Sequence, residues 1–303
     1  MWFRLRRRGA LVAALCCMAA QPSRAQSIGN MLVTDVKNSA GDIWAVWTSP
    51  FHAGTKDWLL AAGALAGSAA ISPLDASIDQ WAAQHRDDGV FNFLNPVREG
   101  GVAFSGKTIT PIAVGTLAVA LVIKNQRVQE GLFGCLSAYA STSAVRTFVV
   151  YPLIARTRPD SSRTFEPPPA RQGDQYHFDF PGSNDWGRHS FPGGHIANVA
   201  ACASFLTNRF AMGFMEPVAW AVVGGVGIGR TLDRRHWTSD QVFGLLFGLG
   251  AGRVVAIRSS HRANRVNAAN GLHGNDDDSF LNHLVVEPSS LGQGYNVGWK
   301  YTF

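Results

Sequence analysis

Six apolar segments rich in Ala, Gly and Leu recur along the chain, with turn-forming residues between them. The segments are 58–71, 110–123, 131–155, 193–210, 216–230 and 239–257. Long apolar stretches without two-residue alternation are typical of helices rather than strands. The pattern therefore predicts an all-α fold with six core helices. Shorter helices are expected between them, for example around "ASIDQWAAQHRD" at 76–87.

The C-terminal residues follow a different pattern. In "YNVGWKYTF", Tyr295, Val297, Trp299, Tyr301 and Phe303 alternate with polar or small residues, which is the period of a strand. Together with "HLVVEP" upstream, this alternation predicts a short C-terminal β-hairpin. We expect its aromatic face to pack on the helical bundle. The alternative is a C-terminal targeting signal, because the pattern resembles the last strand of outer-membrane barrels.

Residues 157–190 form a long segment rich in Pro, Gly and Asp, and they include five aromatic residues. Loops of this length without regular structure are usually functional or disordered, and the aromatic residues favour an ordered loop. A second segment, "GGVGIG" at 224–229, is similar to a nucleotide-binding loop. Its spacing fits neither phosphate-binding motif and no strand precedes it, so we interpret these glycines as a helix-packing surface.

The first 25 residues have the composition of a secretory signal. "MWFRLRRRG" is a basic region, "ALVAALCCMAA" is a short apolar region, and Ser23 and Ala25 are the small residues expected before a cleavage site. Cleavage after Ala25 removes five arginines and lowers the formal net charge from +6 to +1. The basic character of the whole chain therefore belongs to its leader, and the sequence does not indicate nucleic-acid binding.

Two cysteines, Cys135 and Cys202, remain after the leader. Counted along their predicted helices, they lie about 30 Å and about 10 Å from the end that carries the candidate chemistry. A disulfide requires Cα atoms within about 7 Å, so we predict two buried thiols.

Three short elements carry the candidate chemistry. Arg158 and Pro159 end one helix, "PGGH" with His195 opens the next, and "GRTLDRRHWTSD" at 229–240 joins the last two. Guanidinium groups match phosphate oxygens, and a helix start that lacks side chains adds N–H donors. His236 and Asp240 stand four residues apart. If the helix begins just before His236, the carboxylate contacts the imidazole and leaves its far nitrogen free to attack.

These elements resemble the signature of the type 2 phosphatidic acid phosphatase and vanadium haloperoxidase superfamily, which is K-x6-R-P, P-S-G-H and S-R-x5-H-x3-D. The resemblance covers residues 151 to 240, and the helix pattern extends it to about 57–258. It implies a six-core-helix bundle of the acid phosphatase/vanadium haloperoxidase type, here with the C-terminal β-hairpin added. The spacing of Arg230, His236 and Asp240 fits the third motif throughout.

The resemblance also implies roles for these residues. His236 attacks phosphorus and forms a phosphohistidine, Asp240 orients it, and His195 protonates the leaving oxygen. The groups expected to hold the phosphoryl oxygens are Arg158, Arg230, the amides of Gly193 and Gly194, and Tyr151, which stands at the position of the motif lysine. The resemblance implies hydrolysis without a metal or another cofactor.

The chain departs from the signature at three positions, which are Tyr151 for lysine, Gly193 for the first serine and Gly229 for the second. Arg156, Arg188 or Tyr151 itself could compensate for the lost phosphate contacts. The expected function is hydrolysis of a phosphomonoester, whether a lipid phosphate, a diphosphate or a small phosphate ester. The alternatives are a vanadate-dependent haloperoxidase and a non-catalytic relative that binds phosphate or lipid.

The sequence also predicts an organisation and a location. Residues 1–25 are the signal peptide, 26–56 an N-terminal segment, 57–258 the helical phosphatase-like domain and 259–303 a tail with the hairpin. Several apolar stretches have about 14 residues, short of the roughly 20 that cross a bilayer, which favours an exported, periplasmic bundle. The alternative is an integral membrane protein with its site facing the periplasm. The expected partner is a phosphate-ester substrate, and the oligomeric state is not indicated.

Overall fold

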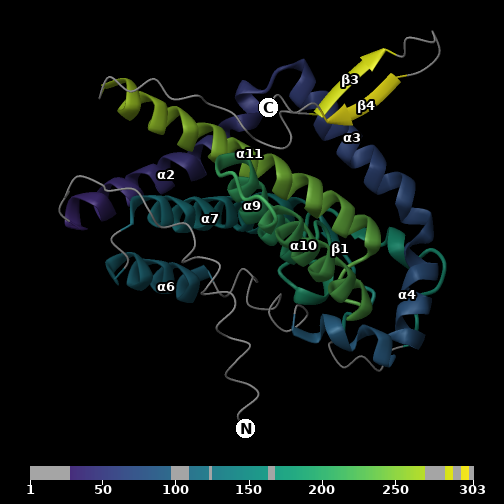
Figure 1. Cartoon of the computed structure of the whole chain (residues 1–303). Coiled ribbons are helices and arrows are strands. Elements are labelled where there is room, and N and C mark those ends of the chain that lie inside the picture. Colours follow the sequence, from purple (N-terminus) through teal and green to yellow (C-terminus); the bar gives the residue numbers. More distant parts are fainter. Residues whose placement is uncertain are drawn as a thin grey trace.

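The computed structural model of the chain describes residues 28–96, 109–122, 125–162, 168–269, 284–288 and 295–299. Helices dominate these residues, as Figure 1 shows, and the all-α prediction is confirmed. The longer helices are α2 (Ile28–His52), α3 (Thr55–Ile71), α4 (Asp75–His85), α6 (Ile109–Val122), α7 (Gln126–Val145), α9 (Gly194–Arg209), α10 (Met215–Leu232) and α11 (Thr238–Ala269). The predicted signal peptide lies outside the described residues, so its cleavage stays a prediction.

Several short elements connect the helices. The 3-10 turns are η1 (Ser72–Leu74), η2 (Gly89–Leu94), η5 (Asp174–Tyr176) and η6 (Trp186–Arg188). A π-helical turn, η4 (Arg146–Val150), and a single turn, α8 (Tyr151–Leu153), follow α7 directly. The strands are β1 (Ala155–Arg156), β2 (Phe178–Asp179), β3 (Leu284–Pro288) and β4 (Tyr295–Trp299).

Each of the six predicted core helices has a counterpart, and three boundaries differ in an informative way. The segment 131–155 is not one helix, because regular α7 ends at Val145. The last core helix, α11, continues to Ala269, past the predicted domain end at 258. The segment 26–56 contains a further long helix, α2, which lies against α7 and α11.

A stripe of glycines lets α11 lie directly on the backbone of α9. A Cβ atom added to Gly244, Gly248 or Gly252 would lie only 2.2–2.4 Å from a backbone carbonyl oxygen of α9. The facing carbonyls belong to Gly193, Ala197 and Ala201, in that order. Because the residue numbers of the glycines on α11 and of the carbonyls on α9 rise in the same direction, the two helices are parallel and their N-termini lie at the same end of the bundle.

Helix α7 packs antiparallel to α9. Glu130 near the start of α7 pairs with Arg209 at the end of α9, whereas Thr142 near the end of α7 bonds Asn198 near the start of α9. The core lies between α7, α9 and α11, where the ring of Phe205 takes the space that a side chain at Gly134 would fill. The C-terminal end of α7 therefore meets the N-termini of α9 and α11.

Cys135 and Cys202 join α7 to α9 through a disulfide, with their Cα atoms 4.4 Å apart. The prediction of two separate thiols is wrong because it counted one continuous helix as far as residue 155. Regular α7 ends at Val145, so Cys135 lies about 16 Å from Arg146, and Cys202 lies about 12 Å from Gly194. At these similar depths the two cysteines are neighbours.

The segment 157–190 is ordered over its described part. β1 pairs antiparallel with β2, and Arg156 forms an isolated bridge with His189. The C-terminal hairpin is confirmed as an antiparallel pair, with Val286 opposite Val297. The side chains of β3 and β4 lie outside the described part of the chain, so the packing of their aromatic face stays a prediction.

Helices α3, α6 and α10 expose many large apolar side chains. The exposed residues are Trp58, Leu59, Leu60 and Leu65 on α3, Val114, Leu117, Val119 and Val122 on α6, and Val218, Val222 and Ile228 on α10. Two stretches of the described chain, Thr55–His85 and Thr238–Val266, are long and apolar enough to cross a membrane. Two such helices are a weak indication of membrane association.

Candidate active site

Four helix ends meet at one end of the bundle and bring the predicted residues together. The N-terminus of α9 carries His195, and His236 lies just before α11. The C-terminal end of α10 carries Arg230, and the segment after α7 leads to Arg158. The imidazole rings of His195 and His236 lie 5.8 Å apart between centroids. The three elements, which are separate in the sequence, therefore come together in one site.

His236 is buried, and its tautomer follows from its contacts. Its Nδ1 lies 2.6 Å from the carbonyl oxygen of Ser190. Because a carbonyl only accepts, Nδ1 carries the proton and donates it. Nε2 is buried and has no hydrogen-bond partner among the described residues. Burial, and then the charge of Arg158, lower the pKa of His236 well below its usual value. The imidazole is therefore neutral, with the lone pair of Nε2 free.

The expected contact between Asp240 and His236 is replaced by an indirect one. The hydroxyl of Ser190 donates to Asp240 Oδ2 at 2.5 Å, while the carbonyl of the same serine accepts from His236. The prediction assumed that the helix begins before His236, whereas α11 begins at Thr238. Asp240 is thus the third residue of α11, where its carboxylate accepts from the backbone N–H of Trp237.

Arg156 holds Asp240 from the other side, and sequence reasoning missed this role. Its Nη1 lies 2.5 Å from Asp240 and 2.8 Å from the Ser239 hydroxyl, while Nη2 lies 2.8 Å from Asp75. Asp75 also accepts from the backbone N–H of Ser239. Asp75 belongs to α4 and Asp240 to α11, so Arg156 links α4 to the start of α11. Both carboxylates are buried. It positions the support of His236 and is not a compensating phosphate ligand.

His195 lies in the first turn of α9, where helix geometry leaves backbone N–H groups without intrahelical acceptors. Its Nδ1 is buried without a hydrogen-bond partner in the described part of the chain. Burial, and then the charges of Arg230, Arg146 and Arg158, lower the pKa of His195 well below its usual value. His195 is therefore neutral.

Arg158 and Arg230 are both buried, in different surroundings. Arg158 donates to the carbonyl oxygens of Trp186, Arg235 and His189 at 2.8–3.0 Å, and its guanidinium lies 4.1 Å from the Trp186 ring centre. Burial lowers its pKa to about 10, so the group stays charged at neutral pH. The Nη2 atom of Arg230 lies 3.1 Å from Asp233.

Arg146 is a third buried arginine at the site, which sequence reasoning also missed. It is 5 % exposed, and its Nη1 makes a long contact of 3.5 Å with Asn198. A Cβ on Gly194 would lie 2.2 Å from this guanidinium, so the glycine at 194 gives Arg146 its space. An Arg at the end of a helix gives little signal in a single sequence, because most such residues reach solvent.

The two glycines at the start of α9 have different roles. Gly193 donates its N–H to the Asp240 carbonyl at 2.9 Å, so the prediction that this amide holds phosphate is wrong. The amide of Gly194 lies inside the first turn of α9 and remains a candidate donor. Tyr151 stacks on His189 at 3.9 Å between ring centres, and the Arg146 guanidinium lies 5.8 Å from its ring centre.

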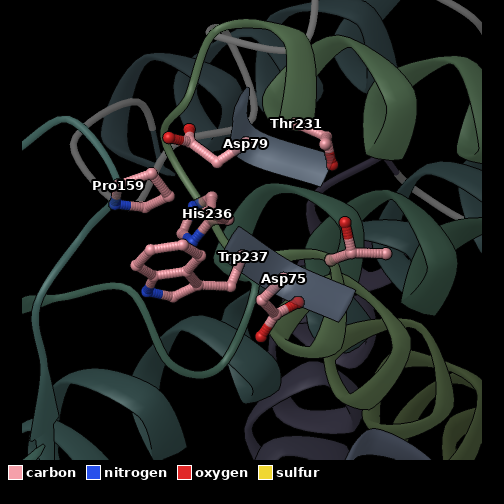
Figure 2. Close-up of a pocket in the computed structure, with 7 residues that line it drawn as sticks. Asp75, Asp79, Pro159, Thr231, His236 and Trp237 are labelled. Carbon is pink, nitrogen blue, oxygen red and sulfur yellow. The ribbon is translucent and has the colours of Figure 1, made fainter. Parts of the chain in front are cut away.

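Beside His236 lies a small pocket, shown in Figure 2. It is lined by Asp75, Asp79, Pro159, Thr231, His236, Trp237 and Thr238. Its two carboxylates are engaged, Asp75 with Arg156 and Ser239, and Asp79 with Arg234 and the amide of Ala170. Within the described ranges, no group of three or more His, Cys, Asp or Glu side chains could hold a metal ion.

Comparison with known families gives one match. Residues 131–263 match the model described as the PAP2 superfamily, and they include most of α7, the whole of α9 and α10, and most of α11. The searches of curated proteins and of solved structures gave no significant match. The matched region contains the residues that the structure gathers at the site.

Proposed function

Because residues 131–263 match the PAP2 superfamily, whose members act on phosphate esters, we propose that the chain hydrolyses a phosphomonoester through a phosphohistidine on His236. The observation that supports this proposal is the free Nε2 of the buried, neutral imidazole, which lies beside the guanidinium group of Arg158, with Arg146 close to the neighbouring His195. Neither guanidinium pairs with a carboxylate of the described residues. Such a site attracts a phosphoryl group and presents a nucleophile to it.

The charge distribution supports an anionic substrate. Five arginines are buried in the described part of the chain, and three of them, Arg156, Arg230 and Arg234, form ion pairs with Asp side chains. Arg146 and Arg158 form no salt bridge there. A buried charge without a counter-charge is costly, so such groups are expected where a ligand supplies the opposite charge.

In the first step, Nε2 of His236 attacks phosphorus, forming the P–N bond as the P–O bond to the leaving group breaks. The Ser190 carbonyl accepts from Nδ1–H and stabilises the charge that develops on the ring. Asp240 fixes Ser190 through its hydroxyl. His195 gives its proton to the leaving oxygen. Burial and then the neighbouring arginines keep His195 neutral, and a bound dianion offsets the arginine charges and raises the pKa of His195.

In the second step, water attacks the phosphohistidine. His195, now neutral, accepts the proton of this water, and the P–N bond breaks. Phosphate leaves and Nε2 of His236 regains its lone pair. The guanidinium groups of Arg158 and Arg230 and the first amides of α9 stabilise the charge on the phosphoryl oxygens in both steps.

Exposed apolar side chains close in the sequence to Arg146, Tyr151 and Gly182 favour a substrate with an apolar part. Phe148 is 70 % exposed and follows Arg146 closely, and Leu153 is 59 % exposed and follows Tyr151. Phe180, 69 % exposed, lies near Gly182, which packs against the Tyr151 carbonyl. Among phosphomonoesters, we therefore expect a lipid phosphate to be preferred over a small hydrophilic ester.

We expect the protein to be exported. The Cys135–Cys202 disulfide fits an oxidising compartment, in agreement with the leader-like N-terminus. The exposed apolar faces of α3, α6 and α10 favour contact with a membrane. Release from membranes by carbonate would identify a peripheral protein, whereas a requirement for detergent would identify an integral one.

The test is turnover of phosphate esters by the purified protein, with lipid and soluble substrates compared. His236→Ala is expected to lower kcat/KM by at least about a thousandfold, because it removes the nucleophile. His261→Ala, at an exposed position of α11, is the matched control and should leave turnover unchanged. A phosphohistidine should be trapped on the wild type and not on His236→Ala.

Other outcomes would select another function. Turnover that survives in His236→Ala contradicts the mechanism. Phosphate binding without hydrolysis of any ester would identify a non-catalytic relative. Peroxide-dependent bromination after addition of vanadate, without phosphatase activity, would identify a haloperoxidase that uses the same anion site.

A further inference from the structure

We propose that Arg146 and Gln241 supply the phosphate contacts that Tyr151 and Gly193 no longer provide, so that the site is complete with a different set of donors. This inference rests on the proposed function only in assuming that the ligand is a phosphoryl anion. The two residues lie on α7–η4 and α11, and neither belongs to the three motifs.

Arg146 supplies the positive charge that the lysine of the first motif would provide. It begins the π-helical turn η4, whose wider winding separates it from regular α7. Its guanidinium lies 5.8 Å from the ring of Tyr151, against the N-terminus of α9 at Gly194. A positive charge is thus present beside the tyrosine that replaces lysine, although it comes from five residues earlier in the chain.

Gln241 takes the place of the first serine. A Cβ on Gly193 would lie 2.9 Å from Oε1 of Gln241, so the glutamine amide occupies the space into which a serine side chain would extend. Gln241 is 5 % exposed. Oε1 is an acceptor, and a half-turn of the terminal amide presents its NH2 donors where the serine hydroxyl is lost.

Unsatisfied polar groups support a ligand at this point. Nε of Arg146 and both polar atoms of the Gln241 amide are buried and have no hydrogen-bond partner within the described ranges. The same holds for Nδ1 of His195 and Nε2 of His236. Buried polar groups in proteins are nearly always satisfied, so unpaired nitrogens on Arg146, His195, His236 and Gln241 favour a polar ligand that reaches them.

The compensating residues considered from the sequence have other partners. Arg156 is bound between Asp75 and Asp240. Arg188 is 46 % exposed and pairs with Asp179. Neither group is free to replace the missing lysine, whereas Arg146 forms no salt bridge in the described part of the chain.

The experiment is calorimetric titration of the purified full-length protein with inorganic phosphate at constant ionic strength. Arg146→Met is expected to weaken phosphate binding roughly 10- to 100-fold, as for a lost charge-assisted contact, and Gln241→Leu roughly fivefold, as for a neutral one. Arg188→Met is the control with a removed charge outside the site, and its affinity should equal that of the wild type. Arg146→Lys should recover part of the affinity.

A second readout distinguishes binding from a structural role. Without phosphate, Arg146→Met and Gln241→Leu should melt at or above the wild-type temperature, because each removes an unsatisfied buried group. With phosphate, the rise in melting temperature should be smaller than for the wild type. Lower stability without phosphate together with an unchanged phosphate-induced rise would show that these residues only pack, and would overturn the inference.

The two proposals fail in different ways. If the variants bind phosphate as tightly as a wild type that hydrolyses esters, Arg146 and Gln241 are not ligands and the proposed function stands. If the wild type binds phosphate through Arg146 and Gln241 but hydrolyses nothing, the phosphate site stands and the proposed function is wrong.

Discussion

At the end of the bundle remote from the two histidines, arginines lie against carboxylates. Asp42 on α2 accepts from Arg258 and Arg262 on α11 at 2.6–2.9 Å, and Glu130 on α7 accepts from Arg209 on α9 at 2.6 Å. At the end that carries the two histidines, carboxylates hold only part of the arginines, and Arg146 and Arg158 form no ion pair among the described residues. The arginines at the remote end thus join helices through carboxylates, whereas we propose that Arg146 and Arg158 bind a ligand anion.

The largest effect on stability is expected for Arg156, whose two carboxylate partners are both buried. Arg156→Met would leave Asp75 and Asp240 buried without their cation, and should lower the free energy of unfolding by about 3–5 kcal/mol. Turnover should fall as well, because Asp240 loses its support. Chemical denaturation and kcat of the remaining folded protein measure both effects. Arg171→Met, at an exposed position, is the control, and equal stability of the two variants would contradict the comparison.

A second test concerns the close approach at the start of α9. Restoring the family residue by Gly193→Ser would place Cβ 2.8 Å from the backbone oxygen of Asp240. We expect a loss of about 1–3 kcal/mol of stability and weaker phosphate binding, because a backbone atom must shift. Gly224→Ser, where a Cβ meets nothing within 4 Å, should be nearly neutral. Tighter phosphate binding in Gly193→Ser would show that the site accepts the family arrangement.

At the remote end, Asp42→Asn should change stability and not catalysis. We expect a loss of about 2 kcal/mol, between the values for buried and surface ion pairs, because Arg258 is 44 % exposed. Thermal melting and kcat/KM measure the two effects, and Asp87→Asn at an exposed position is the control. A fall in kcat/KM would mean that the two ends of the bundle are coupled.

The smallest effect is a difference in pH dependence between the two ends. His195 has a lowered pKa when folded, so below pH 6.5 the unfolded chain binds a proton that the folded chain does not, and stability falls as the pH drops. Burial, together with Glu130, raises the pKa of Asp35 at the remote end to about 6. The folded chain then binds the extra proton, so this group adds stability as the pH falls below about 6.

His195→Gln should therefore reduce the acid loss of stability by up to about 1.4 kcal/mol between pH 6.5 and 5.5. Asp35→Asn should remove the opposing gain. Melting curves between pH 4 and 8 on the empty protein measure both. An unchanged curve for His195→Gln would mean that this imidazole titrates normally in the folded protein.

The hydrophobic pattern was sufficient for most helices. The segments 58–71 and 110–123 differ from α3 and α6 by only a few residues. An apolar run bounded by turn residues forms a helix whatever its position in the bundle, so the local pattern is sufficient. The segment 131–155 was less predictable. Its apolar run crosses a π-helical turn, and periodicity does not reveal the change of winding that brings Arg146 to the site.

The sequence by itself determined the helical fold and the hairpin and singled out His195 and His236 as candidates, because these depend on local periodicity and on the spacing of chemical groups along the chain. Only the tertiary structure decided how those groups are paired. Whether Asp240 contacts His236 or Ser190, whether Cys135 reaches Cys202, and which arginines lack a carboxylate all depend on the register between helices. That register is fixed by contacts such as Gly248 on the backbone of α9, between residues far apart in the chain.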